Sequence, residues 1–211
     1  MVRPMSERAT WAVTTHDWGH DLDRQHLADV RREAQTHDVG GLRHLVLEVL
    51  AYADDEAQAL GRVGLATVTV HPDGAVTVAD DGRGTDTRVD ADGNVVRKPV
   101  MATRDVRFLG AEDAPLLPDG LPRRGMSTVA ALSPLLVHEN RRSNGAWRQA
   151  YRHGIPDDEL RAVTPGPGSG TSVTFLPGES VGGPSSLTAD DVRAFAWLRV
   201  ELHGGTVDAA D

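Results

Sequence analysis

The sequence predicts an α+β fold: a two-layer α/β sandwich in which helices cover one face of a mixed, mostly antiparallel sheet. Two observations support this prediction. A long amphipathic helix precedes a pair of β-branched runs, and further helical and strand-like segments alternate with turns through the rest of the chain. With 211 residues, 39% of them hydrophobic, the chain has the size and composition of one domain with a hydrophobic core.

The first part of the chain contains the clearest helix. Residues 1–40 are polar and rich in His, Asp and Arg, whereas from Leu42 the apolar residues recur at spacings of three, four and seven. Two β-branched runs then flank a Pro-Asp-Gly turn, which predicts a hairpin. The expected elements here are helices over 21–35 and 42–60 and strands over 10–15, 66–70 and 75–79.

Residues 85–124 mix glycine, proline, aspartate and arginine, with one short expected helix at about 100–109. A loop of this length is usually functional or mobile, so we interpret it as a lid. Gly125 then opens an expected helix that ends at Ser133. The remaining expected elements are strands over 135–139, 146–152 and 171–176 and a last helix over 188–203.

Composition and charge exclude several classes of function. The chain has no cysteine, which excludes disulfides, thiolate metal sites and cysteine nucleophiles. A formal net charge of -9 argues against a large nucleic-acid-binding surface, because affinity for phosphate depends on clustered lysine and arginine. No apolar run approaches the ~20 residues that span a bilayer, and the first residues lack the apolar stretch of a signal peptide. We therefore expect a cytoplasmic protein.

Four separated segments each offer a group that a bound nucleotide needs. On the long helix, Glu48, Tyr52 and Asp55 share one stripe, where a carboxylate can orient a water molecule. Residues 80–84 read Asp-Asp-Gly-Arg-Gly after a strand, so a carboxylate can accept from an exocyclic amine and glycines let the backbone approach a flat base. Residues 124–127 lie at an expected helix start, where free N–H groups favour phosphate. In the fourth segment a glycine precedes Thr171, whose hydroxyl can bond to a base or to a bridging water molecule.

Each motif alone is more often a turn or a solvated surface than a site, but their joint occurrence in this order favours a nucleotide pocket. The order resembles the ATPase fold shared by gyrase B, the MutL mismatch-repair proteins, heat-shock chaperones and histidine kinases, the GHKL family with its Bergerat fold. The run Trp147–Gly154 makes the chain look most like gyrase B. The resemblance implies an ATP-binding domain over 41–211, a lid at about 85–124, a divergent N-terminal segment over 1–40 packed on that domain, and no transducer domain.

The resemblance also implies roles for single residues. Glu48 would be the general base that activates water, Asp80 would bind adenine, and Thr171 would be the pocket threonine. Glu56 would be the partner of Arg83. The full set placed around the nucleotide is Tyr52, Asp55, Glu56, Asp80, Arg83, Gly84, Arg124, Gly125, Ser127, Arg142 and Thr171.

Two features depart from the family pattern. The family places an asparagine one turn after the glutamate to hold Mg²⁺, and this position is Tyr52, whose phenol is a poor Mg²⁺ ligand. The end of the lid keeps a single glycine, so Arg123 and Arg124 would hold phosphates by charge. No metal ligand is assigned; the polar residues His16, Asp17, His20 and Asp21 commonly occur in such segments without a ligand role.

The expected function is binding of ATP with weak or absent hydrolysis, and the use of Mg²⁺ stays open. As an enzyme the chain would be a slow ATPase and not a complete topoisomerase. The alternative is a non-catalytic binding or decoy protein that takes an ATP-competitive gyrase inhibitor in the same pocket, or a regulator that pairs with a topoisomerase partner. Direct contact with nucleic acid or membrane is not expected, and the sequence leaves the oligomeric state open.

Overall fold

The computed structural model describes residues 15–17, 21–35, 40–108, 114–157, 160–164, 166–183 and 185–204. Its helices are α1 (Arg24–Ala34), α2 (Gly41–Leu60), α3 (Met126–Ala131) and α4 (Ala189–Arg193), with a 3-10 helix η2 (Val106–Phe108). Its strands are β1 (Gly64–Val70), β2 (Val76–Asp80), β3 (Thr87–Val89), β4 (Val95–Arg97), β5 (Leu135–Arg142), β6 (Gly145–Arg152), β7 (Ile155–Pro156), β8 (Arg161–Ala162), β9 (Gly170–Leu176) and β10 (Leu198–His203). No helix in these ranges is long and apolar enough to span a bilayer.

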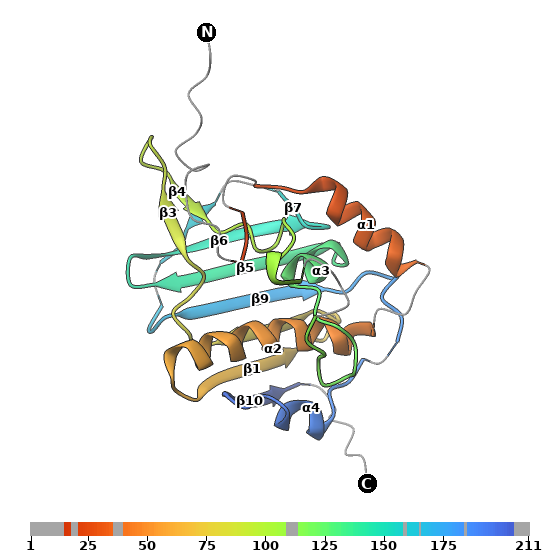
Figure 1. Ribbon diagram of the computed structural model, residues 1–211. Helices are drawn as coiled ribbons and strands as arrows, with labels where there is room; N and C mark the ends of the chain where they lie inside the picture. Colours follow the sequence, from red (N-terminus) through yellow and green to blue (C-terminus); the bar gives the residue numbers. More distant parts are fainter. Residues whose placement is uncertain are drawn as a thin grey trace.

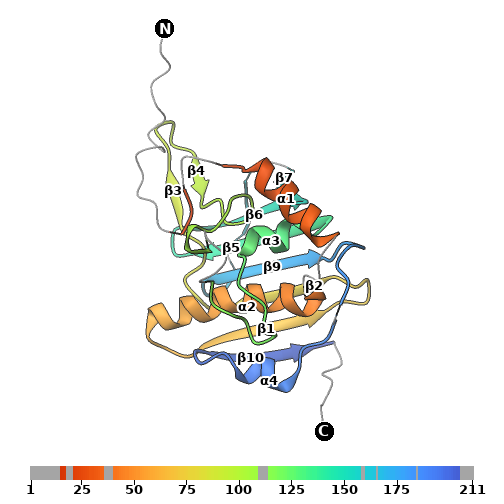
Figure 2. The ribbon, with the colours of Figure 1, turned by 45° about the vertical axis from the view of Figure 1, so that its right-hand side comes forward.

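The main sheet has eight strands in the order β10-β1-β2-β9-β5-β6-β7, with β8 paired to β6. All pairs are antiparallel except β1 with β10, which run parallel. Figures 1 and 2 show α1, α2 and α3 on one face of this sheet. The predicted α+β sandwich with a mixed, mostly antiparallel sheet is confirmed.

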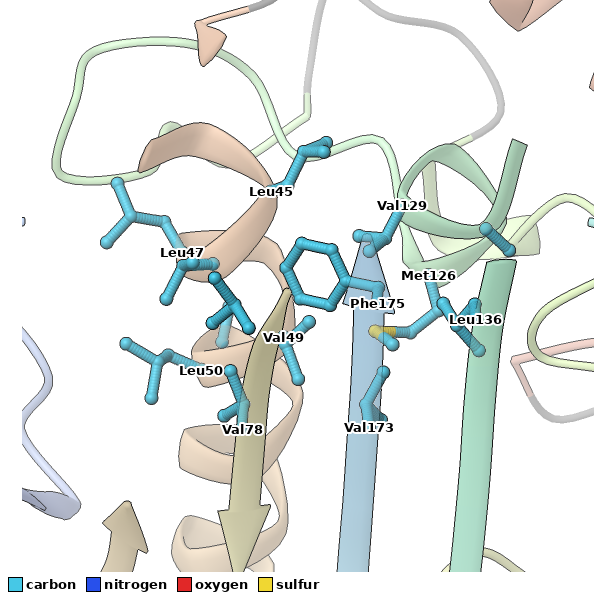
Figure 3. Close-up of a cluster of buried hydrophobic side chains, with 14 of the residues drawn as sticks. Leu45, Leu47, Val49, Leu50, Val78, Met126, Val129, Leu136, Val173 and Phe175 are labelled. Atoms are coloured by element: carbon cyan, nitrogen blue, oxygen red, sulfur yellow. The ribbon is translucent and has the colours of Figure 1, made fainter. Parts of the chain in front are cut away.

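The core lies between α2 and the inward faces of β1, β2, β9 and β5 (Figure 3). Leu50 and Leu45 of α2 are fully buried, and Phe175 of β9 is 1% exposed between the helix and the sheet. Strand alternation turns Val173 and Phe175 to the helices and Thr174 to the opposite, half-buried face. This packing fixes α2 against β2 and β9, the elements that carry half of the predicted site residues.

The predicted helix over 188–203 is wrong. Thr188 does cap a helix, with the capping box that its hydroxyl and the Asp191 carboxylate form, but α4 ends at Arg193. The following strand β10 pairs in parallel with β1, from Gly64 opposite Leu198 to Thr69 opposite His203. The apolar residues of β10 alternate with polar ones, which is the strand pattern, and pairing with β1 satisfies their backbone groups.

The lid differs from its prediction in two ways. It contains the hairpin of β3 and β4, closed by a turn in which Asp90 accepts from the backbone of Asn94, and this hairpin is missing from the prediction. The helix expected at about 100–109 is only η2, because the chain first turns after Pro99, whose carbonyl accepts from Thr103. The expected strand over 10–15 falls almost wholly outside the described residues.

Candidate functional site

A cavity of about 520 Å³ lies between α2, the end of β2, the lid and β9. One side is polar and is formed where β2 ends beside the start of β9. The other side lies under the lid. Its walls include Tyr52, Asp55, Glu56, Asp80, Arg83, Gly84, Arg142 and Thr171, together with Lys98, Met101, Arg107, Met126 and His138.

Asp80 and Thr171 form the polar end of the cavity. Asp80 ends β2, and its carboxylate accepts from the Thr171 hydroxyl and from the backbone N–H of Gly82 at 2.8 Å. Burial raises the pKa of Asp80, against the hydrogen bonds that favour its charged form. The carboxylate and hydroxyl together present an acceptor and a hydroxyl group that can donate or accept, a pattern that suits the amine edge of a purine.

The segment after Asp80 is held by two arginines. The Arg83 side chain donates to Glu56 of α2 at 2.6 and 3.0 Å, which confirms the predicted partnership. Arg142 donates to the Gly84 carbonyl at 2.7 Å from the end of β5. Gly84 has φ +80, and a Cβ there would meet the backbone of Arg141 and the side chain of Asn140. Glycine is therefore required where the loop passes over the sheet.

Tyr52 is locked into an ionic network at the other end of the cavity. Its hydroxyl donates to the buried carboxylate of Asp105, which also accepts from Arg107 at 2.7 Å. Arg107 and Arg123 both pair with Asp55, and their guanidinium groups lie 5.2 and 5.1 Å from the Tyr52 ring centre. Burial and the nearby Asp105 raise the pKa of Tyr52, so its phenol stays protonated at neutral pH.

Replacing Asp105 with asparagine is expected to destabilise the protein by about 2–3 kcal/mol at pH 7. Burial alone would raise the pKa of Asp105, but hydrogen bonds from Arg107 and Tyr52 outweigh it and lower the pKa. The ionised Asp105 therefore stabilises the protein at pH values above its unfolded-state pKa of about 3.9. This stabilisation is lost as the pH falls through the lower folded-state pKa. Urea unfolding at pH 7 and at lower pH should show the gap between wild type and variant narrowing in acid.

The control for that measurement is Asp190→Asn, which removes a surface carboxylate that is 90% exposed and paired with Arg193. Its effect should stay below about 1 kcal/mol at every pH. An Asp105→Asn protein as stable as this control at pH 7 would contradict the assignment of Asp105 as the centre of the network.

Glu48 is fully buried on α2 and does not line the cavity. Its carboxylate accepts from the backbone N–H of Arg124 and from that of Gly125 at 3.2 Å. His44 lies 3.5 Å away and bridges to Asp119. Burial alone would lower the pKa of His44, but the two carboxylates outweigh it and raise it. In this arrangement Glu48 occupies the N–H groups that a phosphate would need.

The structure thus separates the predicted site residues into two groups. Eight of them meet around the cavity, as described above. Four lie outside its wall: Glu48, Arg124, Gly125 and Ser127. Ser127 bonds to His26 of α1 at 2.8 Å, and Arg124 pairs with Glu33 of the same helix.

Sequence reasoning missed several cavity residues, above all Arg107 and His138. His138 comes from β5, and burial together with Arg97 lowers its pKa well below the ordinary value, so it is neutral. The alternation of β5 could have placed His138 on the inward face, but nothing local shows which lid residues return to α2. Long-range packing decides that.

The residues around Tyr52 do not fit a Mg²⁺ site. Mg²⁺ prefers carboxylate, amide and water oxygens in an octahedron, whereas here a protonated phenol and two arginines surround Asp55 and Asp105. In the part of the chain that the structure describes, no three histidine, aspartate or glutamate residues gather as metal ligands.

Comparison with known proteins gives a consistent picture. The chain is 33% identical over 152 residues to the B subunit of DNA gyrase from Helicobacter pylori, covering 68% of this chain and 19% of that protein. It is 32% identical over 176 residues to the B subunit of a type 2 topoisomerase from Aquifex aeolicus, covering 78% and 22%. The chain thus spans about a fifth of the length of these relatives. A scan against protein-family models finds no match.

Among solved structures, the fold is similar to a topoisomerase IV ATP-binding domain of Francisella tularensis in complex with a small-molecule inhibitor. The TM-score is 0.57 at 20% identity, and the match covers 76% of this chain and 43% of that one. At this identity the likeness concerns the fold.

Proposed function

Because this chain belongs to the gyrase B-type ATP-binding domains of the GHKL family, we propose that it binds ATP through adenine contacts in the cavity and hydrolyses it slowly or not at all. The observation that carries the proposal is the joined pair of Asp80 and Thr171 at the polar end of the cavity. Gly84, Arg83 and Arg142 support the backbone beside it.

Slow hydrolysis is proposed from the state of Glu48. A general base must reach the water whose proton it takes, directly or through one water molecule. Here two backbone N–H groups of the lid end and His44 surround the Glu48 carboxylate. Turnover therefore requires the lid end to release Glu48, and the hydrogen bonds oppose this release.

The test is isothermal titration with ATP in EDTA and in Mg²⁺, with a hydrolysis assay on the same protein. Binding is expected in both buffers, with affinities within about threefold, and steady-state turnover is expected to be slow. Absence of ATP binding in either buffer would refute the proposal. Brisk Mg²⁺-dependent hydrolysis that is lost in Glu48→Ala would instead show a competent ATPase.

A second candidate is a non-catalytic protein that takes an ATP-competitive gyrase inhibitor, and the lack of a Mg²⁺ site around Tyr52 favours it. The Asp80 end keeps its polar groups, whereas at the other end Tyr52 and its arginines are held in an ionic network. Such a cavity suits a ligand without a triphosphate. Tight binding of an inhibitor together with no measurable ATP affinity would favour this candidate over the first.

A further inference from the structure

Lys98 is the single lysine of the chain; every other basic residue among its 22 lysines and arginines is an arginine. It directly follows β4, and its backbone N–H donates to the Asp86 carbonyl at 3.2 Å. It lines the cavity together with Arg83, Arg107 and Arg142. Neither the family resemblance nor the comparisons give it a role.

The arginines of the cavity wall are already paired. Arg83 binds Glu56, Arg107 binds Asp55 and Asp105, and Arg142 lies 3.6 Å from Asp86. Among the described residues, Lys98 has no ion pair and no side-chain hydrogen bond. Among the described lysine and arginine residues of the cavity wall, Lys98 is therefore the one without a carboxylate within ion-pair distance.

Lys98 is also poorly solvated. Burial lowers its pKa, against the attraction of Asp105 and with the repulsion of Arg107. Lys98 is half-buried, and a partly buried ammonium group without a partner costs free energy. An anion that enters the cavity removes part of that cost. The charged groups that act on the ammonium are Asp105, Arg107, Asp86 and Arg88, and the first two of them hold Tyr52. Asp80, at the polar end of the same cavity, is not among the groups that act on Lys98.

We propose that Lys98 binds the phosphate groups of the nucleotide. Its positive charge takes the place of Mg²⁺, for which the residues around Tyr52 provide no site. The ligand is then a metal-free adenine nucleotide, held by Asp80 and Thr171 at the base and by Lys98 at the phosphates. This inference rests on the proposed function for the adenine end, but the anion site of Lys98 is testable without it.

The single lysine makes the test direct. Reductive methylation with ¹³C-formaldehyde keeps the positive charge and gives one lysine signal, which NMR separates from the N-terminal amine by its pKa. The protein is titrated in EDTA with ATP, ADP, adenosine and pyrophosphate. ATP, ADP and pyrophosphate should shift the Lys98 signal and raise its pKa by about one unit, because a nearby anion favours the charged form. Adenosine should leave the Lys98 signal unchanged, and the N-terminal signal should not respond to any of the four.

Variants supply the second readout. Lys98→Met should weaken ATP binding at least tenfold in EDTA and leave adenosine binding unchanged, whereas Lys98→Arg should retain most of the ATP affinity. Arg199→Met is the matched control for the loss of one positive charge, since Arg199 is 70% exposed on β10 and does not line the cavity. It should bind ATP like the wild type.

The outcomes separate the two proposals. ATP binding that leaves the Lys98 signal unmoved and is unaffected in Lys98→Met would overturn the role of Lys98 and leave the nucleotide site standing. If no adenine nucleotide binds but pyrophosphate still shifts Lys98, the anion site is supported and the proposed function fails. If pyrophosphate also leaves the signal in place, both are refuted.

Discussion

Replacing Asp80 with asparagine should lower the affinity for ATP by about 100-fold, which corresponds to about 2.7 kcal/mol. The carboxylate accepts from Gly82, from the Thr171 N–H and from the Thr171 hydroxyl, and it is the acceptor proposed for the adenine amine. The asparagine amide keeps one acceptor oxygen, but its NH₂ group would face the N–H and O–H groups that donate to the carboxylate. Titration calorimetry in EDTA measures the loss.

The neighbouring residue offers a matched control. Asp81 pairs with Arg62 at 2.8 Å, bonds to the Leu65 N–H and does not line the cavity. Asp81→Asn should therefore bind ATP like the wild type. Equal affinity losses in both variants would mean that the Asp80 effect is structural rather than a lost contact with adenine.

Replacing Gly170 with alanine should be the most destabilising change in the site, by about 3 kcal/mol or more. Gly170 begins β9 with φ +140, and a Cβ there would lie far inside contact distance of the Asp80 carbonyl oxygen. Either β9 moves away from β2, or the Asp80 carbonyl rotates, and both separate Asp80 from Thr171. Urea unfolding should show the lost stability, and any folded fraction should bind ATP weakly.

Gly168→Ala separates backbone strain from the clash. Gly168 also has a positive φ, +78, but a Cβ there meets nothing within 4 Å. This variant should lose only about 1 kcal/mol. If Gly170→Ala is no worse than Gly168→Ala, the close approach of β9 to Asp80 does not constrain the site.

Much of the fold follows from local patterns. Apolar periodicity predicts α2 almost to its ends, and β-branched runs around a turn predict β1 and β2. The Asn144-Gly145 turn predicts β5 and β6, and the segment that ends before Pro177-Gly178 predicts β9. The polar end of the cavity could also be anticipated, because Asp80 and Thr171 lie at a strand end and a strand start. The pairing of Glu56 with Arg83 followed from the family order and is confirmed.

What the sequence did not predict depends on contacts between distant segments. The genuine helix cap at Thr188 led to the prediction of a longer helix, whereas β1, the partner of β10, lies more than a hundred residues away. Lys98 and Arg107 carry no local signal, since an arginine-rich, aspartate-rich loop is equally consistent with a solvated surface. Only the return of the lid to α2 brings both residues into the cavity wall and puts Arg107 over the Tyr52 ring.

The parallel pairing of β10 with β1 has a consequence for synthesis on the ribosome. β1 is complete once Val70 has emerged, and β2 covers one of its edges soon afterwards, but the other edge waits for Leu198–His203. Until then a β-branched strand presents unpaired N–H and C=O groups to whatever is nearby. The nascent chain therefore has an open edge until Leu198–His203 emerge, and it closes this edge with nearly the last residues that the structure describes.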